Sequence, residues 1–115
     1  MATDAKRNAE TVLSLMSIYN REMSAGGVRL YLSALSKVDS RVLELAAHRW
    51  LMDKSESTHF FPLPSDLLRI VNYIWVEVNE LADRKLGRIA QTDEDHHERS
   101  KLRQAELDRM VKEEL

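Results

Sequence analysis

The sequence predicts an all-α fold, a small bundle of about four helices with a long fourth helix and a charged C-terminal helix or tail. Three observations predict this class. Apolar residues recur at helical spacing in successive stretches. Both prolines fall in one short joint between two of these stretches. A chain of 115 residues that is 43% hydrophobic can build one modest core but not two. We therefore expect a helical domain over residues 1–90 and an appended charged segment over residues 91–115.

The first two helices are predicted on either side of a glycine pair. In residues 4–24 apolar side chains lie at the spacing of one helix face: Val12, Met16, Tyr19 and Met23. Ser24, Gly26 and Gly27 interrupt this pattern. A short second helix follows and is expected to end near Val38, with apolar positions at Val28, Tyr31, Leu32 and Leu35.

A third helix is predicted to begin at Asp39 or Ser40, because either side chain can accept a hydrogen bond from the free N–H groups of a first helical turn. Its apolar face consists of Val42, Leu43, Ala46, Ala47, Trp50 and Leu51. Trp50 is expected in the core, as is Trp75 in the next helix, and a partner-binding aromatic patch is the alternative. A polar loop over residues 54–59 leads to the joint.

The joint, residues 60–66, has the sequence FFPLPSD and contains both phenylalanines as well as both prolines. Pro64 suits the first position of a helix, where its missing N–H would have no partner. The residue before each proline is kept out of the helical region, so the chain turns here. We expect Phe60 and Phe61 to dock between the flanking helices as a hydrophobic plug. The predicted structural joint therefore consists of Phe60, Phe61, Pro62 and Pro64.

The fourth helix is predicted to run from Pro64 to about Ala90, a length of roughly 40 Å. Its apolar stripe alternates steps of four and three residues: Leu67, Val71, Ile74, Val78 and Leu81. Gly87 is a weak point, because glycine inside a helix costs about 1 kcal/mol relative to alanine. The second half of the stripe exceeds what a small core can cover, so we expect it to be available for a homodimer or for another partner.

The composition changes at Thr92. Residues 91–115 contain eight acidic and five basic side chains, a net charge of about −3 against about +1 for the remainder. Thr92 followed by three acidic residues is a favourable helix start. Apolar side chains are sparse in this segment, which is typical of an exposed helix or of a tail that orders on a partner. These side chains are the candidate partner-binding residues: Leu102, Leu107, Met110, Val111 and Leu115.

Charge and cysteine content exclude several classes of function. A net charge of −2 disfavours a strongly electrostatic nucleic-acid binder, which needs clustered Lys and Arg. Without cysteine, neither a disulfide framework nor a Cys-based zinc site can form. The polar residues 1–10 do not resemble an export signal, and no apolar stretch has the length of a membrane span. We therefore expect no membrane association and a location in the cytoplasm.

No residue pattern predicts catalysis, a cofactor or a metal. Residues 93–98 contain metal-binding atom types, but a second cluster with matching spacing is missing, so a solvated helix start is the simpler interpretation. His48 has no serine or acid placed by sequence to form a relay. Gly26-Gly27 lacks the lysine and hydroxyl residue of a phosphate-binding loop. An enzyme is therefore the least supported class, and we expect none.

The short second helix, the turn that follows it and the third helix up to Met52 could alternatively form a helix-turn-helix that reads DNA. The tight turn at Val38, Asp39 and Ser40 precedes a helix whose polar positions are Arg41, Glu44, His48 and Arg49. Ordinary antiparallel helix packing explains the same residues. Glu44 among the basic residues, in an acidic chain, makes groove reading the weaker hypothesis.

Residues 31–70 resemble the bacteriophage family of replicative-helicase loaders and inhibitors. A helix with Tyr31 and Leu35 leads through a turn to a helix with Ala46, Ala47 and Trp50, and then to the joint with Phe61, Pro62 and Pro64. Family members often place Glu after the joint, where this chain has Asp66. The resemblance covers about a third of the chain.

This resemblance implies a small helical N-terminal domain and a mobile C-terminal segment that engages a hexameric replicative helicase. We therefore expect a phage or prophage protein in the cytoplasm of a bacterial host cell that loads or regulates the helicase through protein contacts, with DNA bound only indirectly or weakly. A helix-turn-helix-like DNA-binding module and a structural or host-takeover interaction protein are the alternatives.

Overall fold

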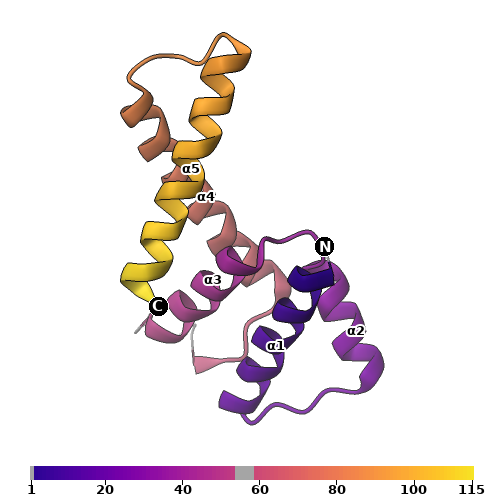
Figure 1. The fold of residues 1–115 in the computed structure, drawn as a ribbon. Coiled ribbons are helices and arrows are strands. Elements are labelled where there is room, and N and C mark those ends of the chain that lie inside the picture. Colours follow the sequence, from indigo (N-terminus) through magenta and orange to yellow (C-terminus); the bar gives the residue numbers. More distant parts are fainter. Residues whose placement is uncertain (1, 54–58) are drawn as a thin grey trace. The chain divides into compact units, whose positions relative to one another are not determined.

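The computed structural model describes residues 2–53 and 59–115, and within these ranges the chain forms helices and turns without a strand (Figure 1). The helices are α1 (Ala2–Ile18), α2 (Ala25–Ala34), α3 (Ser40–Met52), α4 (Pro64–Leu86) and α5 (Asp93–Glu114). The predicted all-α class is confirmed. The count of about four helices is slightly low, because the charged C-terminal segment forms a fifth helix over most of its length.

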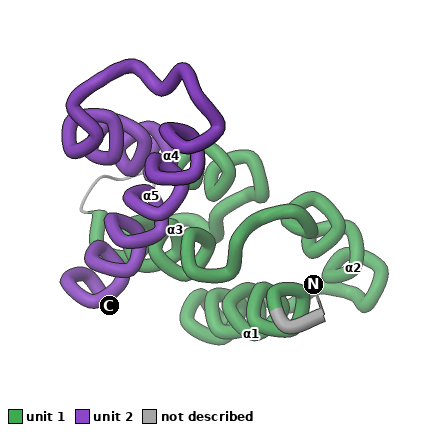
Figure 2. The backbone as a smooth tube through the Cα atoms, turned by 45° about the horizontal axis from the view of Figure 1, so that its top comes forward, with its two compact units in different colours: residues 1–71 green, residues 72–115 purple. Residues whose placement is uncertain are grey.

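The chain divides into two compact units, residues 1–71 and residues 72–115 (Figure 2). The boundary lies inside α4, so the first part of that helix belongs to the first unit. The remainder of α4 forms the second unit together with α5. The division that the sequence suggested, after residue 90, stays a prediction.

In the first unit α1 and α3 lie side by side and run in the same direction. Ser40, the first residue of α3, donates a hydrogen bond of 2.7 Å to Asp4 near the start of α1. One turn further along both helices, Arg7 pairs with Glu44 at 2.8 Å. The largest buried apolar side chains of this unit come from α1, from the residue that caps α2, from α3 and from the first part of α4: Leu15, Leu35, Leu43, Leu45 and Leu67.

The ends of α1 and α2 differ from the prediction because local turns stop both helices early. α1 ends at Ile18, since Asn20 adopts a left-handed conformation (φ 50°) and the N–H of Arg21 bonds back to the Met16 carbonyl at 2.8 Å. α2 ends at Ala34 and not near Val38. The side chain of buried Asn8 donates a 3.0 Å hydrogen bond to the Val38 carbonyl, which ties the following turn to α1.

The helix starts agree with the sequence. Ser24 accepts a hydrogen bond from the N–H of Gly27 at the start of α2, and Asp39 accepts one from the N–H of Arg41 at the start of α3. Although burial opposes it, the hydrogen bonds from Arg41 hold the pKa of Asp39 below its ordinary value. Of the two predicted caps, Asp39 is the one used. Residues 54–58 of the predicted polar loop lie outside the described residues.

At the joint, Pro64 is the first residue of α4, as predicted. Asp66 accepts a hydrogen bond of 2.9 Å from the Leu63 N–H and so completes the helix start. The expectation that both phenylalanines form a plug is wrong for Phe60, whose side chain is 73% exposed. Phe61 is half-buried and Pro62 is buried. The chain bends at Phe60, and it is Phe61 that packs against the rings of Tyr19 and Tyr31.

α4 ends at Leu86 rather than near Ala90, because Gly87 has a positive φ of 75° that a continuing helix does not allow. The buried seam of the helix consists of Leu67, Val71, Ile74, Val78, Ala82 and Leu86. The seam thus passes through Ala82, and Leu81 is half-buried. The second half of the stripe is not available as expected, since Val78 has no exposed surface.

In the second unit, charged side chains join α4 to α5. Asp83 contacts Arg99 at 2.5 Å, and Lys85 pairs with Glu106, whose side chain is 2% exposed. In the connecting loop, Arg88 pairs with Asp95 at 2.7 Å. These contacts link α5, from Asp95 in its first turn to Glu106 near its middle, to the end of α4 and to the connecting loop.

Candidate interaction surfaces

The joint brings together three of the residues on which the expected family resemblance rests, Tyr31, Phe61 and Pro62. The ring of Phe61 lies 5.6 Å from that of Tyr31 and 5.9 Å from that of Tyr19, measured between centroids. The Tyr31 hydroxyl donates a 2.6 Å hydrogen bond to the carbonyl of buried Pro62. Burial, and then the negative charge of Asp66, raise the pKa of Tyr31 well above its ordinary value. Tyr31 therefore fastens the joint to α2 as a neutral phenol.

The remaining residues of that motif lie in the core. Leu35 and Ala46 have no exposed surface, Ala47 is 6% exposed and Trp50 is 8% exposed. The predicted core position of Trp50 is confirmed. Its indole Nε1 has no hydrogen-bond partner among the described residues. The motif thus specifies how the first unit is built, and a partner cannot reach most of it without unfolding.

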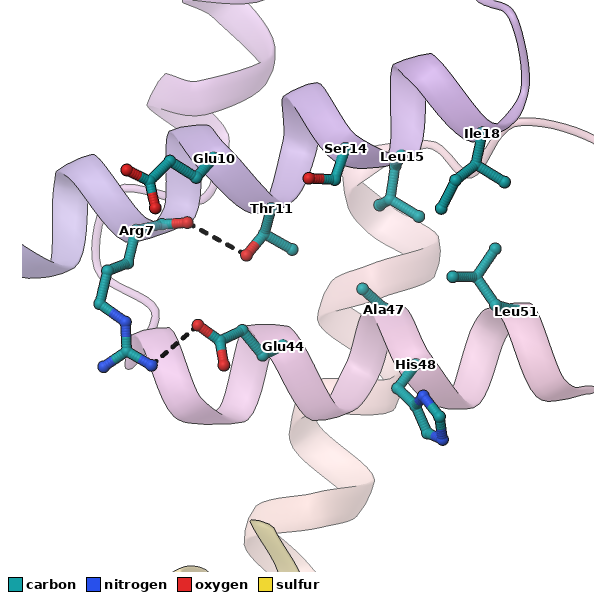
Figure 3. A pocket seen from close by; sticks show the side chains of 10 residues that line it. All are labelled: Arg7, Glu10, Thr11, Ser14, Leu15, Ile18, Glu44, Ala47, His48 and Leu51. Carbon is teal, nitrogen blue, oxygen red and sulfur yellow. Dashed lines mark hydrogen bonds and ion pairs between the residues drawn. The ribbon is translucent and has the colours of Figure 1, made fainter. Parts of the chain in front are cut away.

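A groove lies between α1 and α3 in the first unit (Figure 3). Its volume is about 340 Å³. We call it the α1–α3 groove and define it by its lining residues: Arg7, Glu10, Thr11, Ser14, Leu15, Ile18, Glu44, Ala47, His48 and Leu51. One end is polar and holds the Arg7–Glu44 pair, and the other end is apolar.

Sequence reasoning did not identify this groove. The lining positions follow helical spacing on both elements, but only the parallel alignment of α1 with α3 brings the two rows together. Ile18, the last residue of α1, has a side chain that is 61% exposed, and nothing in its sequence position distinguishes it from the buried residues of the same helix.

The five candidate partner-binding residues of α5 differ in accessibility. Leu107 has no exposed surface and Met110 is 4% exposed. Leu102 and Val111 are half-buried, and Leu115 is 54% exposed. A partner can therefore contact Leu115 directly, whereas Leu107 and Met110 become accessible only when α5 moves.

Glu106, next to Leu107, is a buried carboxylate with two cationic partners. Its side chain contacts the ammonium of Lys85 and accepts a hydrogen bond of 3.0 Å from Arg109. These hydrogen bonds hold the pKa of Glu106 below its ordinary value. The carboxylate therefore stays ionised at neutral pH and fixes the middle of α5 to the end of α4.

Trp75 in α4 is half-buried beneath a cation. The guanidinium of Arg103 lies 5.2 Å from the centroid of its ring, which is a favourable cation–π distance. The indole of Trp75 thus packs against Arg103 within the second unit. The ring is only half-buried, so the predicted core position is only partly confirmed.

The face of α3 proposed for DNA reading is occupied by contacts within the chain. Arg41 pairs with Asp39 at 3.0 Å, and Glu44 pairs with Arg7. His48 is half-buried and lines the α1–α3 groove. A pair that neutralises Arg41 weakens its attraction for phosphate, so the helix-turn-helix hypothesis gains no support here.

The polar and acidic residues at the start of α5 make contacts that stabilise the first turn of this helix and its connecting loop. Thr92 accepts a hydrogen bond of 3.1 Å from the Asp95 N–H, and Asp95 in turn pairs with Arg88.

Within residues 2–53 and 59–115, no three metal-ligating side chains come together at a point that could hold a metal ion. No helix in those ranges is both long and apolar enough to cross a membrane. Comparison with protein-family models, curated proteins and solved structures finds no significant match.

Proposed function

We propose that this protein is a non-enzymatic phage or prophage protein that loads or regulates a replicative DNA helicase through protein contacts. The observation that carries the proposal is the convergence of Tyr31, Phe61 and Pro62 in one joint. The resemblance to helicase loaders and inhibitors rests on these residues and on the helices around them. Their contacts support a shared construction of the N-terminal domain.

The organisation of the second unit supports a role for α5 in binding. Residues 91–115 carry a net charge of about −3 against about +1 for the remainder, and Leu115, directly after α5, is exposed. Few of the apolar residues of α5 are buried. Separating α5 from α4 therefore breaks fewer apolar contacts than separating a core helix would. A helix of this kind can exchange contacts within the chain for contacts with a partner.

The decisive experiment is a calorimetric titration of the whole chain against the purified hexameric replicative helicase of a candidate bacterial host. We expect saturable binding, accompanied by a change in the rate at which the helicase is placed on single-stranded DNA or hydrolyses ATP. An increase identifies a loader and a decrease an inhibitor. Leu115→Lys should weaken binding, whereas Leu30→Lys, at a 75% exposed position on α2, should not.

Two outcomes contradict the proposal. Absence of binding to replicative helicases from several hosts would favour a structural or host-takeover interaction protein. Salt-sensitive binding to duplex DNA, without helicase binding, would instead favour the DNA-binding alternative, because phosphate contacts weaken steeply as salt rises.

A further inference from the structure

We propose that the α1–α3 groove receives a short amphipathic helix of another protein, one that carries apolar side chains at one end of its contact face and a Lys or Arg at the other. This inference goes beyond the helicase proposal, because the groove lies in the first unit and uses none of the candidate residues of α5.

The shape of the groove fits a helix. Its lining residues on α1 extend from Arg7 to Ile18 and those on α3 from Glu44 to Leu51, in the same direction (Figure 3). At 1.5 Å per residue, the α1 row is about 17 Å long, or three helical turns. A trough between two parallel helices is the seat in which a third helix packs, because its side-chain ridge can lie against both neighbours.

The apolar end of the groove exposes large side chains above a closed floor. Leu15 and Ala47 form that floor and are 1% and 6% exposed. Ile18 and Leu51 rise on the two sides and are 61% and 37% exposed. Covering both side chains removes adjacent apolar surface from water, which is the main favourable term in helix docking.

The polar end of the groove determines which charge on a bound helix is favoured. Arg7 and Glu44 neutralise each other at 2.8 Å. The side chain of Glu10 is exposed and forms no ion pair within the described part of the chain. The acidic and basic side chains Arg7, Glu10 and Glu44 therefore leave one unbalanced negative charge in the lining. α1 also has no basic residue in its last turn, so its C-terminal end adds partial negative charge near Ile18.

This charge balance selects among possible occupants. A Lys or Arg on the incoming helix can pair with Glu10, whereas an acidic helix would meet like charge at both ends of the groove. Residues 91–115 of a second copy carry a net charge of about −3 and are for the same reason a poor occupant.

The proposal can be tested on the whole chain with a synthetic peptide of about four helical turns. The peptide has leucines along part of one face and a lysine further along that face. A matched peptide carries glutamate in place of the lysine. Chemical shifts of the ¹⁵N-labelled protein are followed during titration. We expect the lysine peptide to shift signals of the groove residues and to bind at least about tenfold more tightly than the glutamate peptide.

Paired variants separate groove binding from nonspecific association. Ile18→Lys should weaken binding of the lysine peptide by about tenfold or more, whereas Leu13→Lys, 51% exposed on the same helix but outside the groove, should leave it unchanged. Glu10→Lys should abolish the preference for lysine, and Glu80→Lys on α4 should not. Because all four positions are at least half exposed or lie on exposed faces, the variants should fold.

The proposal is overturned if the two peptides bind equally, if the shifts fall mainly on residues 93–114, or if Ile18→Lys and Leu13→Lys have the same effect. Helicase binding by the whole chain is measured separately. Retention of helicase binding in Ile18→Lys leaves the functional proposal intact, whatever the peptide result.

Discussion

Phe60 and Phe61 are neighbours in sequence but differ in structural role. Phe61 packs beside two tyrosine rings, whereas Phe60 is 73% exposed. We expect Phe61→Ala to lower the free energy of unfolding by about 2 to 3 kcal/mol, less than for a fully buried ring. Phe60→Ala should change it by less than about 0.5 kcal/mol. Urea unfolding of both variants measures the difference, and equal effects would contradict the assignment of Phe61 as the residue that closes the joint.

The Tyr31 hydroxyl stabilises the same joint through its hydrogen bond to the Pro62 carbonyl. Tyr31→Phe leaves the buried Pro62 carbonyl without its partner and should cost about 1 to 2 kcal/mol. Tyr73→Phe, at a 68% exposed position, is the control and should cost almost nothing.

The raised pKa of Tyr31 also predicts a pH dependence. Its contribution to stability is complete below about pH 10, the ordinary pKa of tyrosine, and is lost as the pH rises further, because the unfolded chain ionises first. Unfolding curves above pH 10 should therefore fall less steeply for Tyr31→Phe than for the parent. An identical slope would show that Tyr31 ionises equally easily in the folded protein.

At residue scale, the sequence predicted the joint but not which ring would be buried. Pro64 could be placed because its missing N–H and fixed φ act locally. The burial of Phe61 depends on Tyr19 and Tyr31, which precede it by more than one helix. Contacts over such distances leave no periodic signal around residue 61.

Gly87 decides where α4 ends. With a φ of 75°, any side chain there is strained even though nothing lies within 4 Å of its position. We expect Gly87→Ala to lower stability by about 1 kcal/mol. Gly26→Ala, inside α2 with no close neighbour, should instead raise it by about 0.5 kcal/mol, since alanine favours helix. Thermal melts that show the same sign for both variants would contradict this assignment.

The α4–α5 pairing depends on charge, so it should weaken in acid. Because Glu106 has a lowered pKa in the folded protein, its contribution is complete above about pH 4.5 and is lost as the pH falls below that value. Glu106→Gln should reduce stability at pH 7 by about 1 kcal/mol and make it less sensitive to acid. Glu80→Gln is the exposed control. Acid unfolding followed by circular dichroism would disprove the assignment if Glu106→Gln and the parent had the same midpoint.

At element scale, helices were predictable because apolar spacing is a local property, whereas their ends were less so. The predicted starts at Asp39, Pro64 and Thr92 are confirmed, since the start of a helix depends on one side chain and the turn that follows it. The early ends of α1 and α4 depend on left-handed backbone at Asn20 and Gly87. Asparagine in particular permits this conformation without requiring it.

At the scale of the whole molecule, the parallel alignment of α1 and α3 was not predictable from sequence. α1 and α3 can run parallel because α2 and the turns on either side of it return the chain from the end of α1 to the region near its start. The buried side chain of Asn8 donates hydrogen bonds to the Leu35 and Val38 carbonyls and so fixes the turn between α2 and α3 beside α1. A polar residue within an apolar stripe gave no indication of this role, and the α1–α3 groove depends on it.

The division into two units leads to a test of the whole chain by truncation. A chain that ends at Gln91 keeps the first unit and all of α4 but removes α5 and its ion pairs with Asp83 and Lys85. We expect circular dichroism to show that α1–α3 remain folded, because their buried core lies within residues 1–71. The end of α4 should lose helix, since its buried seam is uncovered. If α5 carries the partner contact, this chain should fail to bind the helicase, and the isolated peptide 92–115 should bind weakly because it must become ordered on contact. Full helicase affinity of the truncated chain would place the interface in α1–α4, and unfolding of the first unit would show that α5 is part of its stability.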